Sequence, residues 1–120
     1  MGKKVRSFER IFKSLGNPVR LHILKEISQE PICVSNIAKR LKISNPLTSH
    51  HIKILERENL VIRTKEGVYV RYVLNKEGFD ALVVNFYKYL GIEMEIENIP
   101  KFLRTIKGIE DFLTKQPKLK

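Results

Sequence analysis

Apolar residues recur three or four positions apart through most of the chain, which predicts a largely helical protein. The first helix is expected to present an apolar face formed by Val5, Phe8, Ile11, Phe12 and Leu15. Gly16-Asn17-Pro18 should end it and start the next, because Asn is a favoured N-cap and Pro is tolerated in a first turn. We expect this second helix to end at Pro31 and to bury Val19, Ile23, Leu24 and Ile27.

Two shorter helical patterns follow, separated by a tight turn at Lys42-Ile43. Ser35 is expected to cap the third helix, whose inner positions are Ile37, Ala38 and Leu41. Ser44 is expected to cap the fourth helix, which tolerates Pro46 in its first turn and ends at Asn59. Along the fourth helix one stripe should face the core, formed by Thr48, Ile52 and Leu55.

Beyond the fourth helix the apolar pattern turns strand-like. Residues 60–65 and 68–74 are predicted to form a β-hairpin that turns at Glu66-Gly67. A fifth helix is expected over residues 76–90, and Asn98 should begin a last helix after Gly91. This order predicts a mainly α protein with a small β-hairpin, a winged helix-turn-helix over residues 1–90. Residues 91–120 would add a C-terminal helical extension that serves dimerisation.

The positive charge of the chain lies mainly in its first part. The 120 residues carry a net charge of +10. Residues 1–75 hold 15 Lys and Arg against 6 Asp and Glu, a net charge of +9, and the remainder is nearly neutral. The charge excess therefore accompanies the helix-turn-helix and the hairpin. A basic domain of this kind indicates a polyanionic partner, and the helical pattern makes double-stranded DNA the expected one.

The side of the fourth helix opposite the core stripe carries side chains suited to DNA. Asn45 and Ser49 are short and can hydrogen-bond base edges, as Asn does with adenine. Apolar contact with a thymine methyl group is available to Pro46 and Leu47. Farther along, Lys53 and Arg57 are placed for phosphate, and His50 is expected to contact DNA. The alternative is that these residues only form a solvated face.

The hairpin supplies a second basic element, with Arg63, Lys65 and Arg71. In a winged helix-turn-helix these residues would approach the phosphate backbone or the minor groove. The alternative is an ordinary exposed basic hairpin.

Several other classes of protein are disfavoured. The single cysteine, Cys33, excludes an intrachain disulfide and is typical of a reducing compartment. No apolar run reaches the ~18 residues of a membrane span, and no signal-peptide pattern opens the chain, so a cytoplasmic protein without a membrane partner is expected.

Metal and enzyme chemistry are disfavoured as well. His50 and His51 point about 100° apart on a helix and cannot readily share a metal ion. His51 is expected to be a partly buried packing residue. The absence of a nucleophile–base set and of a Gly-rich phosphate loop argues against an enzyme, and no cofactor or metal is expected.

Three sequence segments resemble one known family. LGNPVRLHILKEI, VSNIAKRLKISNPLTSHHIKILERENLV and TKEGVYVRYVL are similar to the ArsR/SmtB family of winged-helix repressors, over roughly residues 12–90. The resemblance implies homodimers that pair through the first and last helices and repress a nearby operon until an effector releases them. It places the DNA-reading positions at Ser44, Asn45, Pro46, Leu47, Ser49 and His50.

The chain departs from that family at both familiar metal sites. Arsenic, cadmium and lead sensors carry a C-x-C pair before the third helix, whereas this chain has Cys33-Val34-Ser35. Zinc and nickel sensors place Asp and His pairs on the fifth helix, whereas residues 76–90 hold Asp80 and no histidine. Neither metal response is therefore expected, and the effector is unknown. Cys33 is expected to be a small apolar packing residue, with a thiol switch as the alternative.

The remaining apolar stripes exceed what one small core is expected to hide, which favours a two-fold dimer reading an inverted repeat. The expected interface residues are Phe8, Ile11, Phe12, Phe86, Ile99, Phe102, Leu103, Ile106, Ile109, Phe112 and Leu113. The last helix could instead pack on its own subunit. The sequence thus predicts a sequence-specific transcriptional regulator, a repressor by resemblance. The alternative is a winged-helix module that binds DNA non-specifically or pairs with another protein.

Overall fold

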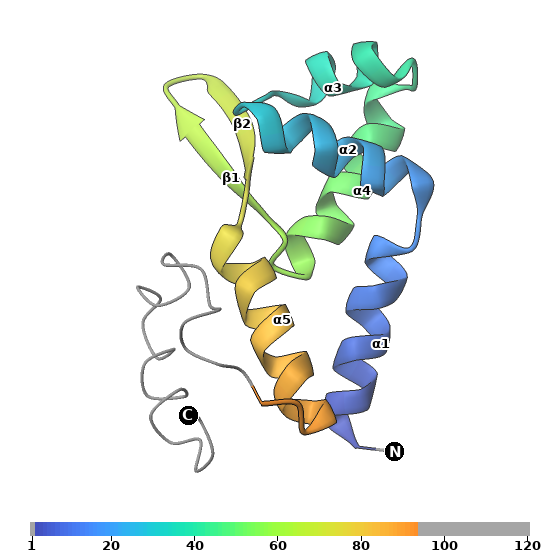
Figure 1. Ribbon diagram of the computed structural model, residues 1–120. Helices are drawn as coiled ribbons and strands as arrows, with labels where there is room; N and C mark the ends of the chain where they lie inside the picture. The colour runs from blue at the N-terminus through green and yellow to red at the C-terminus, as the bar shows by residue number, and fades with distance from the viewer. Residues whose placement is uncertain (1, 94–120) are drawn as a thin grey trace. The chain divides into compact units, whose positions relative to one another are not determined.

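The computed structural model describes residues 2–93. The elements follow in the order α1 (Lys3–Leu15), α2 (Pro18–Gln29), α3 (Val34–Leu41), α4 (Asn45–Arg57), β1 (Val61–Glu66), β2 (Tyr69–Leu74) and α5 (Lys76–Leu90) (Figure 1). The predicted mainly α fold with a small β-hairpin in a winged helix-turn-helix order is confirmed. The predicted last helix and its dimerisation role lie outside the described residues. The chain divides into two units, and the second begins at Lys76.

The boundary between α1 and α2 forms as predicted. The Asn17 side chain accepts hydrogen bonds from the backbone N–H groups of Val19 at 2.9 Å and Arg20 at 3.1 Å, and Pro18 occupies the first helical position. The carboxamide thereby satisfies two N–H groups that have no partner within the helix. The helix ends at Gln29, two residues before Pro31, because a residue that precedes proline disfavours helical geometry.

The start of α3 differs from the prediction that Ser35 caps this helix. Cys33 is the N-cap, without a side-chain capping bond, and Ser35 lies in the first turn. The cause is a backbone pairing just upstream. Ile32 exchanges two hydrogen bonds with Tyr72 of β2, at 3.2 and 2.9 Å, which keeps the chain extended up to that point. The helix then begins immediately, and the backbone N–H of Ile37 donates to the Cys33 carbonyl at 3.1 Å.

The predicted turn between α3 and α4 is built on Lys42. This residue has φ of +58°, which is the left-handed conformation that commonly ends a helix. Its N–H donates to the carbonyl of Lys39, and the N–H of Ile43 donates to that of Ala38 at 3.1 Å. These bonds satisfy carbonyls at the end of α3 and turn the chain sharply toward α4.

The hairpin turns one residue later than predicted. Glu66 pairs with Tyr69 in the antiparallel register, so the two turn residues are Gly67 and Val68 rather than Glu66 and Gly67. The reason is conformational, because the favoured two-residue hairpin turns need a positive φ at their first residue. In the predicted turn that residue would be Glu66, whereas glycine adopts a positive φ without strain. Gly67 has φ of +61°. The pairing therefore extends one residue farther on β1.

The core of the first unit lies where α2, α3, α4 and the base of the hairpin meet (Figure 1). The largest fully buried side chains are Ile23, Ile37, Ile52, Leu55, Leu60 and Thr48. Each comes from one of these elements or from the segment that joins α4 to β1. This core fixes α4 against the rest of the helix-turn-helix.

The second unit is described through α5 and the residues that close it. The helix has the predicted bounds, and Gly91, with φ of +72°, ends it with a backbone bond to the Lys88 carbonyl at 3.1 Å. Burial raises the pKa of the Asp80 carboxyl, and the negative charge of Glu77 adds to this rise. Among the helices that the structure describes, none is both long and apolar enough to cross a membrane.

Candidate nucleic-acid interface

The two sides of α4 differ sharply in burial. The inner side holds Thr48, His51, Ile52 and Leu55, which are all buried. The opposite side exposes Asn45, Pro46, Leu47, His50, Lys53 and Arg57, while Ser49 is half-buried. Because the inner side is buried in the core, the side of α4 that a partner can reach is the side predicted to contact DNA.

The first turn of α4 is capped and open to solvent. The Ser44 hydroxyl accepts a hydrogen bond from the Leu47 N–H at 3.2 Å. The Ser44 carbonyl accepts bonds from the Thr48 N–H at 3.0 Å and hydroxyl at 2.9 Å. The predicted cap is thus confirmed. The positive end of the helix dipole lies at this turn, an arrangement that favours a nearby phosphate.

Arg20 joins α4 to the end of α1, a role that the sequence did not indicate. Its guanidinium donates from Nε to the Ser14 carbonyl at 2.6 Å and from a terminal nitrogen to the Lys13 carbonyl at 3.3 Å. The other terminal nitrogen lies 3.0 Å from Nδ1 of His51 on α4. The only signal in the sequence was that Arg20 stands within the segment resembling the known family.

His51 is more than the partly buried packing residue that the sequence predicted. Its side chain lies in the interior and is hydrogen-bonded to Arg20. Burial lowers the pKa of the His51 imidazole, and the charges of Arg20 and His50 lower it further. Each of these causes favours the neutral ring.

A second polar contact joins α1 to the end of α4. The Glu58 carboxylate is 4% exposed and lies 3.3 Å from Nε of Arg10 on α1. Its other oxygen lies 3.6 Å from Nε of Arg57, which is mostly exposed. The predicted phosphate contact of Arg57 would therefore compete with an ion pair inside the protein.

The three basic residues of the hairpin lie on two faces. Arg63 pairs with Tyr72, and Lys65 with Val70, whereas Arg71 pairs with Thr64. Side chains alternate between the faces of a strand, so Arg63 and Lys65 share one face while Arg71 projects from the other. All three are exposed. The wing therefore offers two cations to one surface, and Arg71 is directed elsewhere.

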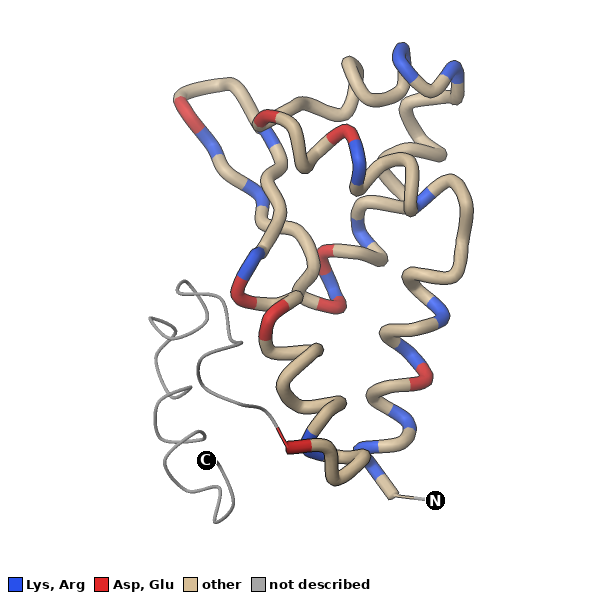
Figure 2. Tube along the Cα trace, in the orientation of Figure 1, with Lys and Arg blue, Asp and Glu red and all other residues tan. Residues whose placement is uncertain are grey.

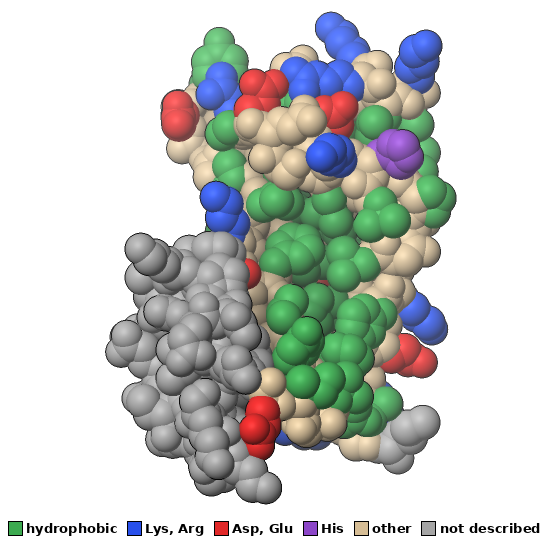
Figure 3. Space-filling view, viewed as in Figure 1, with side chains coloured by type: hydrophobic (Ala, Val, Ile, Leu, Met, Phe, Trp, Pro, Cys, Tyr) green, Lys and Arg blue, Asp and Glu red, His purple; other side chains and the backbone are tan. Residues whose placement is uncertain are grey.

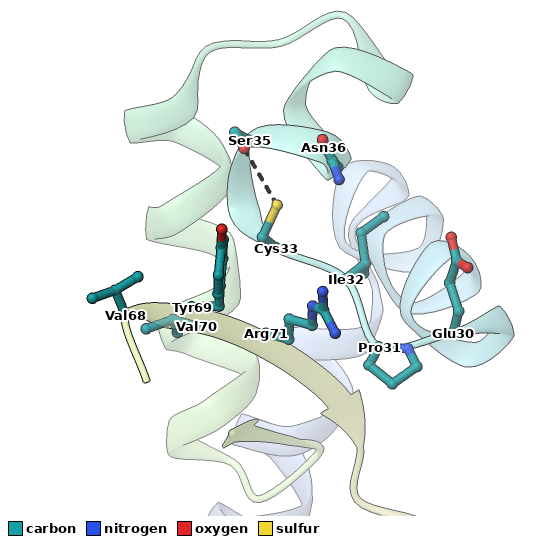
Figure 4. Close-up of a pocket in the computed structure, with 10 residues that line it drawn as sticks. All are labelled: Glu30, Pro31, Ile32, Cys33, Ser35, Asn36, Val68, Tyr69, Val70 and Arg71. Carbon is teal, nitrogen blue, oxygen red and sulfur yellow. Dashed lines mark hydrogen bonds between the residues drawn. The ribbon is translucent and has the colours of Figure 1, made fainter. Parts of the chain in front are cut away.

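Arg71 helps to line a cavity between the wing and the start of α3 (Figure 4). The cavity has a volume of about 660 Å³. Its lining residues are Glu30, Pro31, Ile32, Cys33, Ser35, Asn36, Val68, Tyr69, Val70 and Arg71. Figure 4 shows these side chains coming from the α2–α3 segment on one side and from β2 and its preceding turn on the other.

Cys33 is half-buried at this cavity and is not among the fully buried core residues. Its sulfur lies 3.3 Å from the Ser35 hydroxyl oxygen. This hydrogen bond lowers the pKa of the Cys33 thiol, an effect that burial opposes and that nearby backbone groups support. Within residues 2–93, no group of three or more His, Cys, Asp or Glu side chains is placed to hold a metal ion.

Basic residues follow the trace around the helix-turn-helix and along the strands of the wing, as Figure 2 shows. Figure 3 shows Lys and Arg side chains projecting from the end that carries α3 and the hairpin, with a few acidic ones among them. Part of this charge is neutralised within the protein. Arg40 of α3 bonds Glu30 at 2.8 Å and Glu26 at 3.3 Å, which ties α3 to α2 and its C-cap.

The predicted dimer residues are described only in part. Phe8 and Ile11 are half-buried on α1, and Phe12 is 41% exposed with its ring stacked on Phe8 at 6.4 Å between centroids. Phe86 stacks on Tyr89 of α5 at the same centroid distance. The remaining predicted residues, from Ile99 to Leu113, lie outside the described part of the chain. Self-association through these side chains stays a prediction.

Comparison with known proteins places this architecture in a family. Residues 17–63 match the model of the bacterial regulatory protein, ArsR family. An uncharacterised HTH-type transcriptional regulator of Methanocaldococcus jannaschii is 37% identical over 73 residues, which cover 60% of this chain and 82% of that protein. The arsenical resistance operon repressor of Bacillus subtilis is 31% identical over 80 residues, which cover 66% of this chain and 76% of that protein.

A solved structure agrees at the level of fold. The homodimeric winged helix-turn-helix DNA-binding domain of a possible ArsR-family regulator from Mycobacterium bovis has a TM-score of 0.57 and 23% identity. The alignment covers 76% of this chain and 89% of that one. Sequence and fold together identify the chain as a member of the ArsR family of winged helix-turn-helix, DNA-binding transcriptional regulators.

Proposed function

We propose that this protein is a cytoplasmic repressor that binds its operator as a homodimer, with α4 in the major groove and the wing on the adjacent backbone. The observation that carries the proposal is the division of α4 into a buried inner side and an open, capped first turn. A helix held in this way projects its first residues away from the protein, which is the geometry by which helix-turn-helix proteins read base edges.

Base contacts would come from the start of α4. Asn45 can bond an adenine bidentately, and Ser49 can donate to or accept from a base edge. Pro46 and Leu47 provide apolar contact with a thymine methyl group. Ser44 and His50 complete this set, and Lys53 lies farther along the exposed side for phosphate. These assignments rest on exposure and on chemical type.

The wing would supply backbone contacts through Arg63 and Lys65. They share a face of the hairpin and are exposed, so their flexible side chains can reach phosphates or the minor groove. Arg71 projects from the opposite face and lines the cavity beside Cys33. We therefore assign it a smaller part in DNA binding than the sequence suggested.

Homodimerisation and repression are supported by similar proteins. The Mycobacterium bovis neighbour is described as homodimeric, and the Bacillus subtilis relative as an operon repressor. A two-fold dimer would present two copies of α4 to half-sites one helical turn apart, and its operator would therefore be an inverted repeat. We place the interface at the predicted apolar residues of α1, α5 and the segment that follows.

The test is a fluorescence-anisotropy titration of the protein on the duplex upstream of its own gene, with a scrambled duplex as control. Both duplexes are titrated at two salt concentrations, with and without zinc. A preference for the upstream duplex by a factor of about 10³ or more, unchanged by zinc, supports a specific, metal-independent regulator. Equal affinity for both duplexes with a steep salt slope would overturn the proposal in favour of non-specific binding.

A further inference from the structure

One guanidinium connects three parts of the helix-turn-helix unit. Arg20 stands on α2, donates to the carbonyls of Ser14 and Lys13 at the end of α1, and reaches Nδ1 of His51 on α4. The contacts with these two carbonyls orient the guanidinium, because its N–H donors point in fixed directions within one plane. The orientation of the guanidinium then defines where the His51 ring, and with it the middle of α4, can lie.

The contact between Arg20 and His51 requires a particular state of the imidazole. An arginine can only donate, so Nδ1 of His51 must accept, and the ring proton must stay on Nε2. The ring is then neutral. A second proton would occupy the nitrogen that faces the guanidinium, which would replace a hydrogen bond at 3.0 Å by a contact between two cations.

We propose that Arg20 is a positioning residue for the recognition helix α4 and acts through the neutral ring of His51. Protonation of His51 then breaks its hydrogen bond with Arg20 and weakens DNA binding. This inference rests on the proposed function of α4. It adds a pH dependence of DNA binding that does not come from the residues proposed to contact bases, since His51 lies on the buried side of α4.

Burial of the His51 ring and the charges around it set the direction of the response. Arg20 of α2 and His50 of α4 act on the ring, and both disfavour a second positive charge. Within the described residues, α3 and β1 also pack on α4, and no charged group on them contributes to the lowered pKa. The pKa of His51 therefore lies below the ordinary value of 6.5. Folding stability is full above pH 6.5 and falls as pH drops from 6.5 to the lower folded pKa.

DNA affinity follows with the same sign. At neutral pH the His51 ring is uncharged and its hydrogen bond with Arg20 is intact. DNA affinity then decreases as the pH falls through the pKa of His51. The decrease can reach about tenfold per pH unit for each subunit, because binding must then displace one proton per ring. His50 is a second imidazole, next to His51 in the chain and exposed on the DNA-facing side of α4. The test therefore uses the His50→Gln protein as its background.

The first measurement needs no DNA. A ¹H–¹⁵N spectrum of the imidazole groups is recorded on the His50→Gln protein at pH 7.5. The His51 signal is the one that disappears in His50→Gln/His51→Gln. It should report the Nε2–H tautomer. Arg20→Gln in the same background removes one nearby cation and should raise the pKa of His51. A protonated ring or the Nδ1–H tautomer at pH 7.5 would overturn the proposal.

The second measurement is the affinity for the upstream duplex between pH 5.5 and 8. His50→Gln should lose affinity as the pH falls, whereas His50→Gln/His51→Gln should keep nearly constant affinity, because glutamine can accept the bond from Arg20 without titrating. Circular dichroism at each pH checks that both proteins stay folded. Parallel pH profiles for the two proteins would refute the proposal. If the unsubstituted protein does not bind the upstream duplex specifically at any pH, the proposed function fails, while the tautomer of His51 still reports on the Arg20 contact.

Discussion

The recognition helix α4 and the wing are held in different ways. The helix buries four side chains, is capped at its start, and is tied to α1 through Glu58 and to α2 through His51. Within residues 2–93, the buried side chains of the hairpin are Val61 and Tyr72, which lie near its base. At its tip Val68 is 87% exposed and Tyr69 is 68% exposed.

The contrast matches two kinds of DNA contact. Reading a base edge requires a side chain in one defined place, because the bonds are short and directional. Holding a phosphate tolerates movement, since Arg and Lys bring long flexible chains and the charge acts over several ångströms. The rigid element therefore carries the proposed base contacts, and the loosely anchored one carries the backbone contacts.

The largest expected effect comes from breaking the rigid element. Leu55→Ala leaves a cavity at a fully buried site of α4 and should lower the free energy of unfolding by about 2–5 kcal/mol. Val68→Ala at the wing tip should change it by less than about 0.5 kcal/mol. Urea denaturation measures both. Equal losses in the two variants would mean that the wing tip is packed as tightly as the helix.

A second prediction separates base contacts from backbone contacts. Asn45→Ala should weaken binding to the preferred duplex by about 1–3 kcal/mol and relax its sequence preference. Arg63→Gln should weaken binding to preferred and scrambled duplexes alike and reduce the slope of log affinity against log salt by about 1. Anisotropy titrations at several salt concentrations test both. The assignment is wrong if Arg63→Gln alters sequence preference while Asn45→Ala does not.

The turn of the wing offers a third comparison. Gly67→Ala places a side chain at φ of +61°, where no atom of the described residues beyond its two chain neighbours lies within 4 Å of the added carbon, so the cost is conformational. It should be about 1–2 kcal/mol. Gly67→Asn is the matched control and should lose less, because Asn tolerates the left-handed region. Thermal unfolding of both proteins provides the measurement, and an Asn variant less stable than the Ala variant would contradict the turn geometry.

The smallest effect is expected at the cap of α4. Ser44→Ala removes the acceptor of the Leu47 N–H and should cost about 1 kcal/mol, whereas Ser44→Asp should restore most of it. The Asp variant should nevertheless bind DNA more weakly than Ser44→Ala, because its carboxylate would stand beside phosphate. Unfolding and anisotropy measured on the same samples check both statements. Tighter DNA binding by the Asp variant would remove Ser44 from the interface.

Prediction from sequence succeeded where a local cause decides the structure. Asn17-Pro18 and Ser44 carry their capping chemistry within a few residues, so the starts of α2 and α4 could be placed. Ser35 failed as a cap because the start of α3 depends on pairing between Ile32 and Tyr72, forty positions apart. Arg20 and His51 were likewise undetectable as partners, since only the tertiary fold brings α2 and α4 together.

The two outer edges of the hairpin differ in a way that bears on solubility. The bridge from Ile32 covers part of the outer edge of β2, and among the described residues the outer edge of β1 has no strand partner. Open edges invite association with other strands, and charged side chains discourage it. Arg63 and Lys65 stand on that strand beside exposed Ile62. Neutralising both charges to weaken DNA binding would therefore also favour self-association. Light scattering should be measured on such variants before any loss of affinity is interpreted.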